Sequence, residues 1–450
     1  MEMTTRRLFI AFLVAFSFVQ VIFVVLRRSL HGTWKFLISR AHFLVSQQLA
    51  MTLGSYFIWS MLSPLICSFG DDLHLRYTSK RRPIICLQDT FKALLCLFLA
   101  LTHICFIFYF VWVGEEPNLF ALFSFISVAL YLHMIVFLGA IAFFHAFSRA
   151  LIKFGIFANF LRSAMAYQMT HRLIGMVMAI LVVLGGLWVA HLPPNVRFVR
   201  VPIKDLPRPQ IGVKFSLLTD VHIGPSVGRT RVQQMVDLSN SLRPDVVAIS
   251  GDLVDGFARD LADAVHPLHD LKSTYGAYFA TGNHEYIHGD VVEWFEYLRQ
   301  IGVRPLHNEH VNIEISNSSL CIAGVDDLYA ERSRYPGHAM DYKKAISGCA
   351  ENATVVVLAH QPNAVGIMLA DRVAAAKMDL ILSGHTHAGQ MYIFVPLVYA
   401  LNAFVRGLYY DSSSQTYIYV SAGVNYFGPP VKMFGTCEIV LIELVMLGEH

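Results

Sequence analysis

The segment Val213–His222 reads VKFSLLTDVH, an apolar run that ends in Asp220-Val221-His222. A second apolar run, Val246–Ile249, leads in the same way into the cluster Gly251-Asp252-Leu253-Val254-Asp255. Short apolar runs bounded by glycine and polar residues are typical of buried strands. These two stretches decide the fold class, because each joins a buried strand to a polar cluster at its carboxyl end.

Four more runs have the same character, and amphipathic stretches lie between them. The further predicted strands are Tyr278–Ala280, Leu320–Ala323, Val355–Leu358 and Leu380–Leu382. Between the first two strands, Val232, Met235, Val236 and Leu242 recur at helical spacing and share one face. Strands that alternate with amphipathic helices indicate a layered α/β domain, which we predict over residues 213–450.

Polar clusters directly follow five of these strands. They are Asp220-Val221-His222, Gly251-Asp252-Leu253-Val254-Asp255, Gly282-Asn283-His284-Glu285, His360 and Gly384-His385-Thr386-His387. A single cluster of this kind is more often a solvated turn. Five in succession predict one shared site, because open α/β folds bind ligands at the carboxyl ends of their strands.

The chemistry of the clusters is that of a divalent metal site. Carboxylate, imidazole and amide oxygen are ligand types for manganese, iron or zinc. In an extended segment, residues two apart point to the same side, so Asp220 and His222 can share one ion. His385 and His387 have the same spacing.

The motifs D-x-H, G-D-x-x-D, G-N-H-E, a lone histidine after a strand, and G-H-x-H resemble those of the calcineurin-like metallophosphoesterase family. The resemblance covers nearly the whole C-terminal half and implies a four-layer α-β-β-α sandwich. It also implies two metal ions, one held by Asp220, His222, Asp252 and His387, the other by Asp252, Asn283, His360 and His385. Asp252 would bridge them. Ala388 and Gly423-Val424-Asn425 depart from the common pattern without removing a ligand, which leaves the fit of the substrate open.

The resemblance further implies hydrolysis of a phosphomonoester or phosphodiester by a hydroxide shared between two metal ions. His284, beside Asn283, is the candidate acid, and Asp255, Glu285, Asp326 and Asp327 are candidate supporting groups. The alternative is a catalytically silent membrane scaffold or receptor with a metal-binding domain. The intact ligand set favours the enzyme.

The N-terminal half has the composition of a membrane protein. The chain is 55% hydrophobic and 15% charged, which is too apolar for an ordinary soluble protein. Five stretches are long enough to cross a bilayer: Leu8–Leu26, Phe43–Leu65, Phe91–Val113, Leu119–Phe144 and Leu173–Leu192. We therefore predict a membrane region over 1–192 and a proline-rich linker over 193–212. Phe154, Phe157, Phe160 and Leu161 predict a short amphipathic helix, either on the bilayer surface or packed on other helices.

Charges in the loops predict the sidedness of the catalytic domain. The loop Gly114–Pro117 has no basic residue and is expected outside, whereas Arg76, Lys80 and the segment Arg149–Arg172 make its neighbours basic. The domain after the fifth span is then lumenal or extracellular, and the sequons at Asn317 and Asn352 agree. The first loop, with Arg27, Arg28, Lys35 and Arg40, is basic although this topology would place it outside, so it disagrees with the assignment.

The remaining features narrow the function. The net charge of +3 gives no global field for nucleic acid, and His103, His133 and His145 lack paired acids, which disfavours a transporter. The seven cysteines suggest neither a zinc ribbon nor a disulfide framework, and we expect buried thiols. The apolar run Met391–Val405 is either a lip toward lipid, which would favour a lipid or lipid-linked substrate, or a buried strand and loop.

Overall fold

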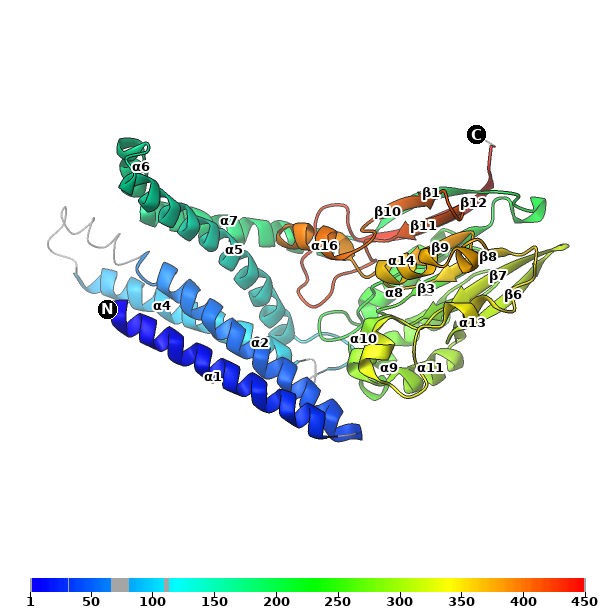
Figure 1. Cartoon of the computed structure of the whole chain (residues 1–450), viewed down its shortest axis with the longest axis horizontal. Helices are drawn as coiled ribbons and strands as arrows, with labels where there is room; N and C mark the ends of the chain where they lie inside the picture. Colours follow the sequence, from blue (N-terminus) through cyan, green and yellow to red (C-terminus); the bar gives the residue numbers. More distant parts are fainter. Residues whose placement is uncertain (1, 31, 66–80, 109–112, 449–450) are drawn as a thin grey trace. The chain divides into compact units, whose positions relative to one another are not determined.

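The computed structural model describes residues 2–30, 32–65, 81–108 and 113–448 (Figure 1). The chain forms two compact units, one of Met1–Phe106 with Leu130–Ile180, the other of Ile107–Ala129 with Leu181–His450. The predicted basic residues Arg76 and Lys80 lie outside the described residues.

Long helices make up the N-terminal region. They are α1 (Glu2–Ser29), α2 (Gly32–Leu62), α4 (Arg81–Ile104), α5 (Leu119–Lys153) and α7 (Gln168–His191), with the short α6 (Ala158–Met165) before the last. Among the described residues, four helices are long and apolar enough to cross a membrane: α1, α4, α5 and α7. The predicted span Phe43–Leu65 falls largely in α2, which is not among these four, so the number of spans stays a prediction.

Polar side chains of α2 face polar side chains of α4 inside the helical unit. The side chain of Gln48 in α2 lies 2.6 Å from Nδ1 of His103 in α4, and Ser55 Oγ lies 2.9 Å from its Nε2. Polar residues facing one another in this way satisfy their hydrogen bonds away from lipid. His103 is therefore a hydrogen-bonded residue between helices, and His145 likewise contacts His171 at 3.0 Å.

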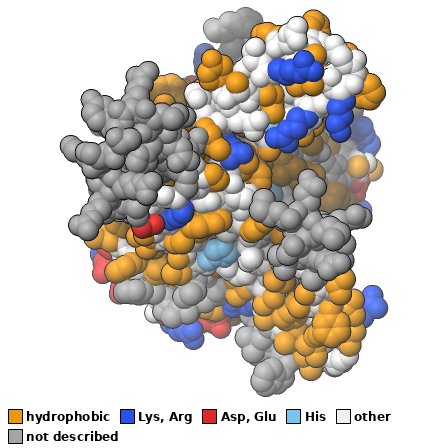
Figure 2. Space-filling model, turned by 90° about the vertical axis from the view of Figure 1, so that its left-hand side faces the viewer, with side chains coloured by type: hydrophobic (Ala, Val, Ile, Leu, Met, Phe, Trp, Pro, Cys, Tyr) orange, Lys and Arg blue, Asp and Glu red, His pale blue; other side chains and the backbone are white. Residues whose placement is uncertain are grey.

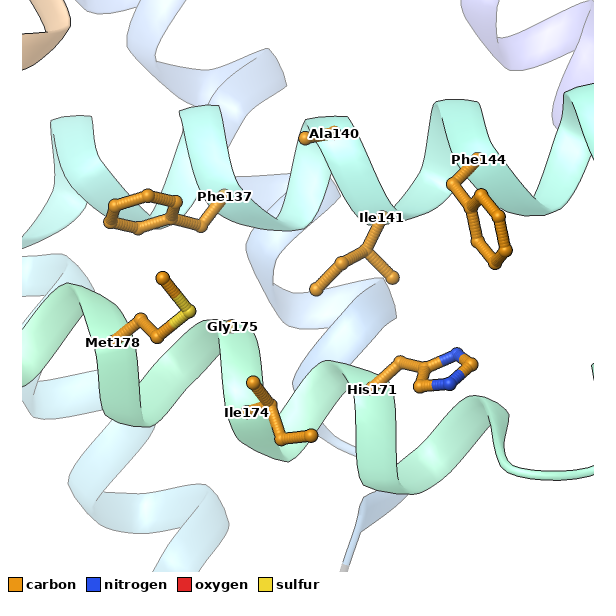
Figure 3. Close-up of a pocket in the computed structure, with 8 residues that line it drawn as sticks. All are labelled: Phe137, Ala140, Ile141, Phe144, His171, Ile174, Gly175 and Met178. Atoms are coloured by element: carbon orange, nitrogen blue, oxygen red, sulfur yellow. The ribbon is translucent and has the colours of Figure 1, made fainter. Parts of the chain in front are cut away.

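Hydrophobic side chains make up much of the coloured surface shown in Figure 2, and Lys and Arg side chains are scattered over it, several of them near the top. On and before α6, Phe154, Phe157 and Phe160 are each more than 70% exposed, whereas Leu161 is buried. This exposure favours the bilayer surface for the predicted amphipathic helix. Between α5 and α7 lies an apolar cavity of about 370 Å³, lined by residues that include Phe137, Phe144 and Met178 (Figure 3).

The second unit contains two six-stranded sheets. Their strands are β1 (Asn195–Ile203), β2 (Lys214–Leu218), β3 (Val246–Ser250), β4 (Ala277–Ala280), β5 (Val303–Pro305), β6 (Glu309–Ile315), β7 (Ser318–Gly324), β8 (Thr354–Leu358), β9 (Leu380–Ser383), β10 (Gly407–Asp411), β11 (Thr416–Val420) and β12 (Glu438–Met446). The first sheet has the order β1-β12-β2-β3-β4-β5 and the second β10-β11-β9-β8-β7-β6. In each sheet the strands that carry the predicted clusters run parallel, so their carboxyl ends share one edge.

Helices cover the outer face of each sheet. They are α8 (Arg229–Ser241), α9 (Ala258–Val265), α10 (Asn283–His288), α11 (Val291–Gln300), α12 (Tyr329–Ser333), α13 (Tyr342–Ile346), α14 (Pro362–Ala370) and α15 (Arg372–Ala375). A further helix, α16 (Val395–Leu401), has no buried residue. One apolar core lies between α8, α9 and α11 and the first sheet, and another between α13, α14 and α15 and the second. A third core joins the sheets, where Phe215 and Leu217 of β2 face Val356 and Leu358 of β8. The domain is a four-layer α-β-β-α sandwich, as expected.

The segment 193–212, predicted to be a linker, is part of this sandwich. It contains β1, which pairs in parallel with β12 from Asn195 to Ile203. The prolines in the segment stop a helix but are compatible with an edge strand, because an edge strand leaves one side of its backbone unpaired. The membrane region is thus joined to the domain through a strand of the first sheet.

The structure also differs from the expectation for cysteine. Cys321 in β7 and Cys349 after α13 form a disulfide, with 5.6 Å between their Cα atoms. The sequence gives no sign of this pair, because the two cysteines are 28 positions apart. The end of β7, two short helices and loops lie between them, and only the folded chain brings the two thiols together.

A loop between two membrane helices belongs to the same unit as the sandwich. Glu116 accepts hydrogen bonds from the backbone N–H and the hydroxyl of Thr230, each at 2.6 Å, and Arg229 N–H donates to the carbonyl of Glu115 at 2.9 Å. These bonds hold the predicted external loop Gly114–Pro117 against the start of α8.

Candidate metal centre

Both sheets contribute to the candidate site. Asp220 and His222 follow β2, Asp252 follows β3, and Asn283 opens α10 after β4. From the second sheet, His360 follows β8, and His385 and His387 follow β9. All seven predicted ligands therefore sit at strand ends, and their side chains are buried or nearly so.

The first group consists of Asp220, His222 and His387, whose potential ligand atoms lie within 4.8 Å of one another. Nε2 of His387 is 3.3 Å from Oδ1 of Asp220 and 3.0 Å from Nε2 of His222. Two imidazole nitrogens and a carboxylate oxygen that converge in this way suit a divalent cation.

The second group consists of Asp252, His360 and His385, again within 4.8 Å. Oδ2 of Asp252 lies 3.1 Å from Nε2 of His360 and 3.8 Å from Nε2 of His222, so it stands between the two groups. Asn283 is the seventh predicted ligand. Its Oδ1 is buried and accepts no hydrogen bond from the described part of the chain, which leaves that oxygen available to a cation.

The charges of the site follow from burial and from the mutual contacts of its residues. Burial acts to raise the pKa of Asp252, but His360 and His284 outweigh it and hold this pKa well below its usual range. Burial also lowers the pKa of His385 to about 3, so this imidazole is neutral and can act as a ligand.

The backbone at the site is unusual. Asp220, His222, Asp252, His385 and His387 all have positive φ, between 47° and 69°. Residues other than glycine rarely adopt this left-handed conformation, which costs about 1–3 kcal/mol each and concentrates at functional sites. The prediction that Asp220 and His222 point to the same side because they lie in an extended segment is therefore wrong. Their side chains converge because both residues have a left-handed backbone.

Two glycines make room for the carboxylates. A Cβ atom on Gly282 would collide with the carboxylate and backbone nitrogen of Asp252, and one on Gly384 would collide with the carboxylate of Asp220 and with Thr219. The glycines in the motifs G-N-H-E and G-H-x-H are thus required by the close approach of the acidic side chains.

Comparison with known proteins agrees with this geometry. Residues 213–389 match the family model of the calcineurin-like phosphoesterases. The chain is 42% identical to a Caenorhabditis elegans protein provisionally named a metallophosphoesterase, over 96% of this chain and 95% of that one. It is 39% identical to the transmembrane protein with metallophosphoesterase domain of Bos taurus, over 88% and 87% of the two chains, and 36% identical to that of Danio rerio, over 91% and 90%. The chain belongs to the calcineurin-like metallophosphoesterases.

In this metallophosphoesterase, Asp255 orients two histidines at once. Its Oδ1 lies 2.9 Å from Nδ1 of His222 and 2.7 Å from Nδ1 of His284. A carboxylate on Nδ1 fixes the tautomer and the ring, and leaves Nε2 to face the site. Nε2 of His284 is 3.9 Å from Oδ2 of Asp252, and its ring packs against Phe427 with 4.6 Å between centroids.

Glu285 supports the loop that carries Asp252. Its carboxylate accepts hydrogen bonds from the backbone N–H groups of Gly282, Asp252, Leu253 and Val254, at 2.6 to 3.2 Å. This structural role agrees with the prediction for Glu285. Asp327 acts similarly, since it accepts from the side chain of Gln361, the neighbour of His360, at 2.7 Å.

Lys432 is a residue of the metallophosphoesterase site that sequence reasoning missed. It is 1% exposed, its Nζ lies 3.2 Å from Nδ1 of His387, and it donates to the carbonyls of Ala422 and Asn425 at 2.7 Å. The cluster Gly423-Val424-Asn425 follows β11, as the other clusters follow their strands, but β11 was not among the predicted strands. A prediction of β11 would have pointed to this region.

A second histidine cluster lies beside the site. Asp326, which is fully buried, contacts Nδ1 of His307 at 2.7 Å and Nδ1 of His338 at 3.3 Å. The hydroxyl of Tyr286 also lies 3.0 Å from Nδ1 of His338. Asp326 therefore holds the segments that carry His307 and His338, and no bond among the described residues joins it to the seven predicted ligands.

Proposed function

We propose that this metallophosphoesterase hydrolyses phosphoester bonds with two divalent cations, manganese, iron or zinc, held by Asp220, His222, Asp252, Asn283, His360, His385 and His387. The observation that carries the proposal is the position of Asp252, whose Oδ2 lies within 4 Å of a histidine from each group. A carboxylate between two sets of imidazoles is suited to bridge two cations.

The donor set fits such a centre. It offers imidazole nitrogens, carboxylate oxygens and the amide oxygen of Asn283, which has no other donor among the described residues. Two cations bound there would supply Lewis-acid stabilisation of the phosphoryl oxygens and a hydroxide nucleophile near neutral pH. The chain's own residues must then orient the ester and donate one proton to the leaving oxygen.

His284 is the residue proposed to move that proton. Oδ1 of Asp255 lies 2.7 Å from its Nδ1, and its Nε2 is on the side of the site where Asp252 lies. From Nε2, the ring can donate a proton to the leaving oxygen or a hydrogen bond to a phosphoryl oxygen. Asp255 acts through His284 and His222 as a positioning residue.

The test is turnover by the purified full-length protein, loaded with manganese, on an aryl phosphodiester and an aryl phosphomonoester. His284→Ala should lower turnover by about 10² to 10⁴ with metal content near wild type, and the exposed His269→Ala is the matched control. The two esters separate a diesterase from a monoesterase. If the wild-type protein binds metal but hydrolyses neither ester, the scaffold or receptor alternative replaces the enzyme.

We also propose that the catalytic domain is lumenal or extracellular. In support, Asn317 and Asn352 of the two sequons are exposed in turns, and the Cys321–Cys349 disulfide suits an oxidising compartment. Glycosidase treatment should increase the mobility of the protein made in a eukaryotic cell, and Asn317→Gln with Asn352→Gln should remove the effect. Digestion of the domain by a protease confined to the cytosolic side would contradict the proposal.

A further inference from the structure

One residue connects the candidate metal centre to a membrane helix. The backbone N–H of Lys432 donates to the carbonyl of Gly186 in α7 at 3.1 Å, while its Nζ lies 3.2 Å from His387. A Cβ on Gly186 would collide with Val431, so the glycine allows the loop Tyr426–Gly435 to lie directly on the helix. The loop beside the metal ligands is therefore fixed to α7.

The bond to Lys432 lies near the carboxyl end of α7. α7 is long and apolar enough to span a membrane, and Gly186 lies five residues before its end at His191. At about 1.5 Å per residue this is about 8 Å along the helix. Trp188, in the same turns, is 68% exposed, and tryptophan is typical of the headgroup level. If α7 crosses the bilayer, its bond to Lys432 would place the candidate metal centre close to the bilayer surface.

α16 has the character of an interfacial helix. Its sequence is VPLVYAL, and each of its seven residues is at least partly exposed. Leu397 is 54%, Tyr399 64% and Leu401 63% exposed. Large apolar side chains are unfavourable in water, whereas a bilayer would bury them.

α16 and the loop Tyr426–Gly435 form one surface beside His387. Val395 of α16 packs with Ala388 and Met433, and Gln390 bonds the backbone of Phe427 and Met433. Phe434, next to Met433, is 82% exposed. We call the exposed side chains of this surface the apolar rim: Tyr392, Leu397, Tyr399, Leu401, Phe427 and Phe434.

We infer that the apolar rim lies in the headgroup layer of the membrane and that the substrate is a membrane lipid with a phosphoester in its headgroup. The inference rests on the proposed hydrolase function and names its substrate class. A water oxygen forms the new bond to phosphorus, the bond from phosphorus to the leaving oxygen breaks, and the leaving oxygen takes up a proton. The bond to α7 and the rim would bring the phosphoester to the site without removing the acyl chains from the bilayer.

The first test compares lipid and soluble substrates in the full-length protein. Reconstituted in phosphatidylcholine vesicles that contain phosphatidate or phosphatidylglycerol, the protein should hydrolyse one of these lipids. Leu397→Asp with Leu401→Asp should lower lipid hydrolysis by about tenfold or more, with hydrolysis of a soluble aryl phosphoester unchanged. Val373→Asp is the matched control, because Val373 is 77% exposed in α15. It should change neither rate.

The second test reads lipid contact without turnover. Phe434→Trp should add fluorescence that is quenched by vesicles with brominated acyl chains, and Val373→Trp should add fluorescence that is not. Absence of quenching at position 434, or hydrolysis of the aryl ester with none of either lipid, would overturn the inference while the hydrolase function stands. Absence of aryl ester hydrolysis in the wild type would instead overturn the proposed function, and quenching would still report the rim.

Discussion

Nζ of Lys432 lies 3.2 Å from Nδ1 of His387, although Lys432 is 45 residues further along the chain. Burial lowers the pKa of Lys432, and the carbonyls of Ala422 and Asn425 hold its side chain in place. A side chain that contacts the second nitrogen of a metal-binding histidine holds the ring in the orientation that metal binding needs.

Replacing Lys432 should therefore weaken metal binding. In Lys432→Met, His387 loses its contact at Nδ1 and two carbonyls lose their donor. Affinity for the manganese ion proposed to bind His387 should therefore fall by about 10- to 100-fold. Titration of the metal-free protein measures this. Lys272→Met, at an exposed position, should bind metal as the wild type does. Equal affinity in both variants would contradict a positioning role for Lys432.

Replacing the proposed bridging carboxylate should have a larger effect. Asp252→Asn removes the charge that both histidine groups share, so both metal ions should be lost and turnover should become unmeasurable. Metal analysis and aryl ester assays on the same sample decide this. Asp263→Asn, at an exposed position of α9, is the control. Retention of two ions in Asp252→Asn would show that Asp252 does not bridge.

Glu285 should matter for stability as well as for the site. Glu285→Ala removes the acceptor of four buried backbone N–H groups, which should cost about 2–4 kcal/mol of unfolding free energy and loosen the Asp252 loop. Thermal unfolding of the metal-free protein isolates the stability effect. Glu296→Ala, exposed on α11, should leave the melting temperature within about 2 °C. A similarly small shift for Glu285→Ala would show that its four hydrogen bonds do not stabilise the loop that carries Asp252.

Asp379 predicts a dependence of stability on pH. Burial raises its pKa to about 6, although it accepts a hydrogen bond from Val355 N–H at 2.8 Å. Because the folded pKa exceeds the unfolded value near 4, stability is lost as pH rises through 6. Asp379→Asn keeps an acceptor and should be more stable by about 1–3 kcal/mol at pH 7.5, with the difference gone below pH 4. A difference that does not vary with pH would refute the assignment.

The strands that carry ligands were predictable because each is a buried apolar run that ends in a polar cluster. β1 was not, because its alternation of Val and Arg among prolines is typical of an edge segment, and it becomes a strand only by pairing with β12. The left-handed backbone at Asp220 and His387 was equally hidden, since these residues rarely adopt it without tertiary constraint.

The candidate site itself was predictable in its members but not in its surroundings. Each of the seven predicted ligands follows a strand closely in the sequence, and the parallel strands bring these ends to one edge of each sheet. Lys432, His307 and His338 lie in irregular segments, and only the packed loops bring them near the strand ends. The Cys321–Cys349 disulfide was missed for the same reason, because its partners meet only across the folded second sheet.

The hydrogen bonds from Thr230 to Glu116 bear on how the hydrolase half can be isolated. A fragment starting near Leu192 would keep both sheets and every proposed ligand, yet the N–H groups of Arg229 and Thr230 would lose their acceptors. The first turn of α8 would then fray in solution. The segment just before this turn contacts Tyr426, because the Tyr426 hydroxyl donates to the carbonyl of Ser226 and its ring packs with Val227. Adding a short peptide that spans Gly114–Asn118 should restore the missing acceptors, so the two pieces would complement each other as separate chains.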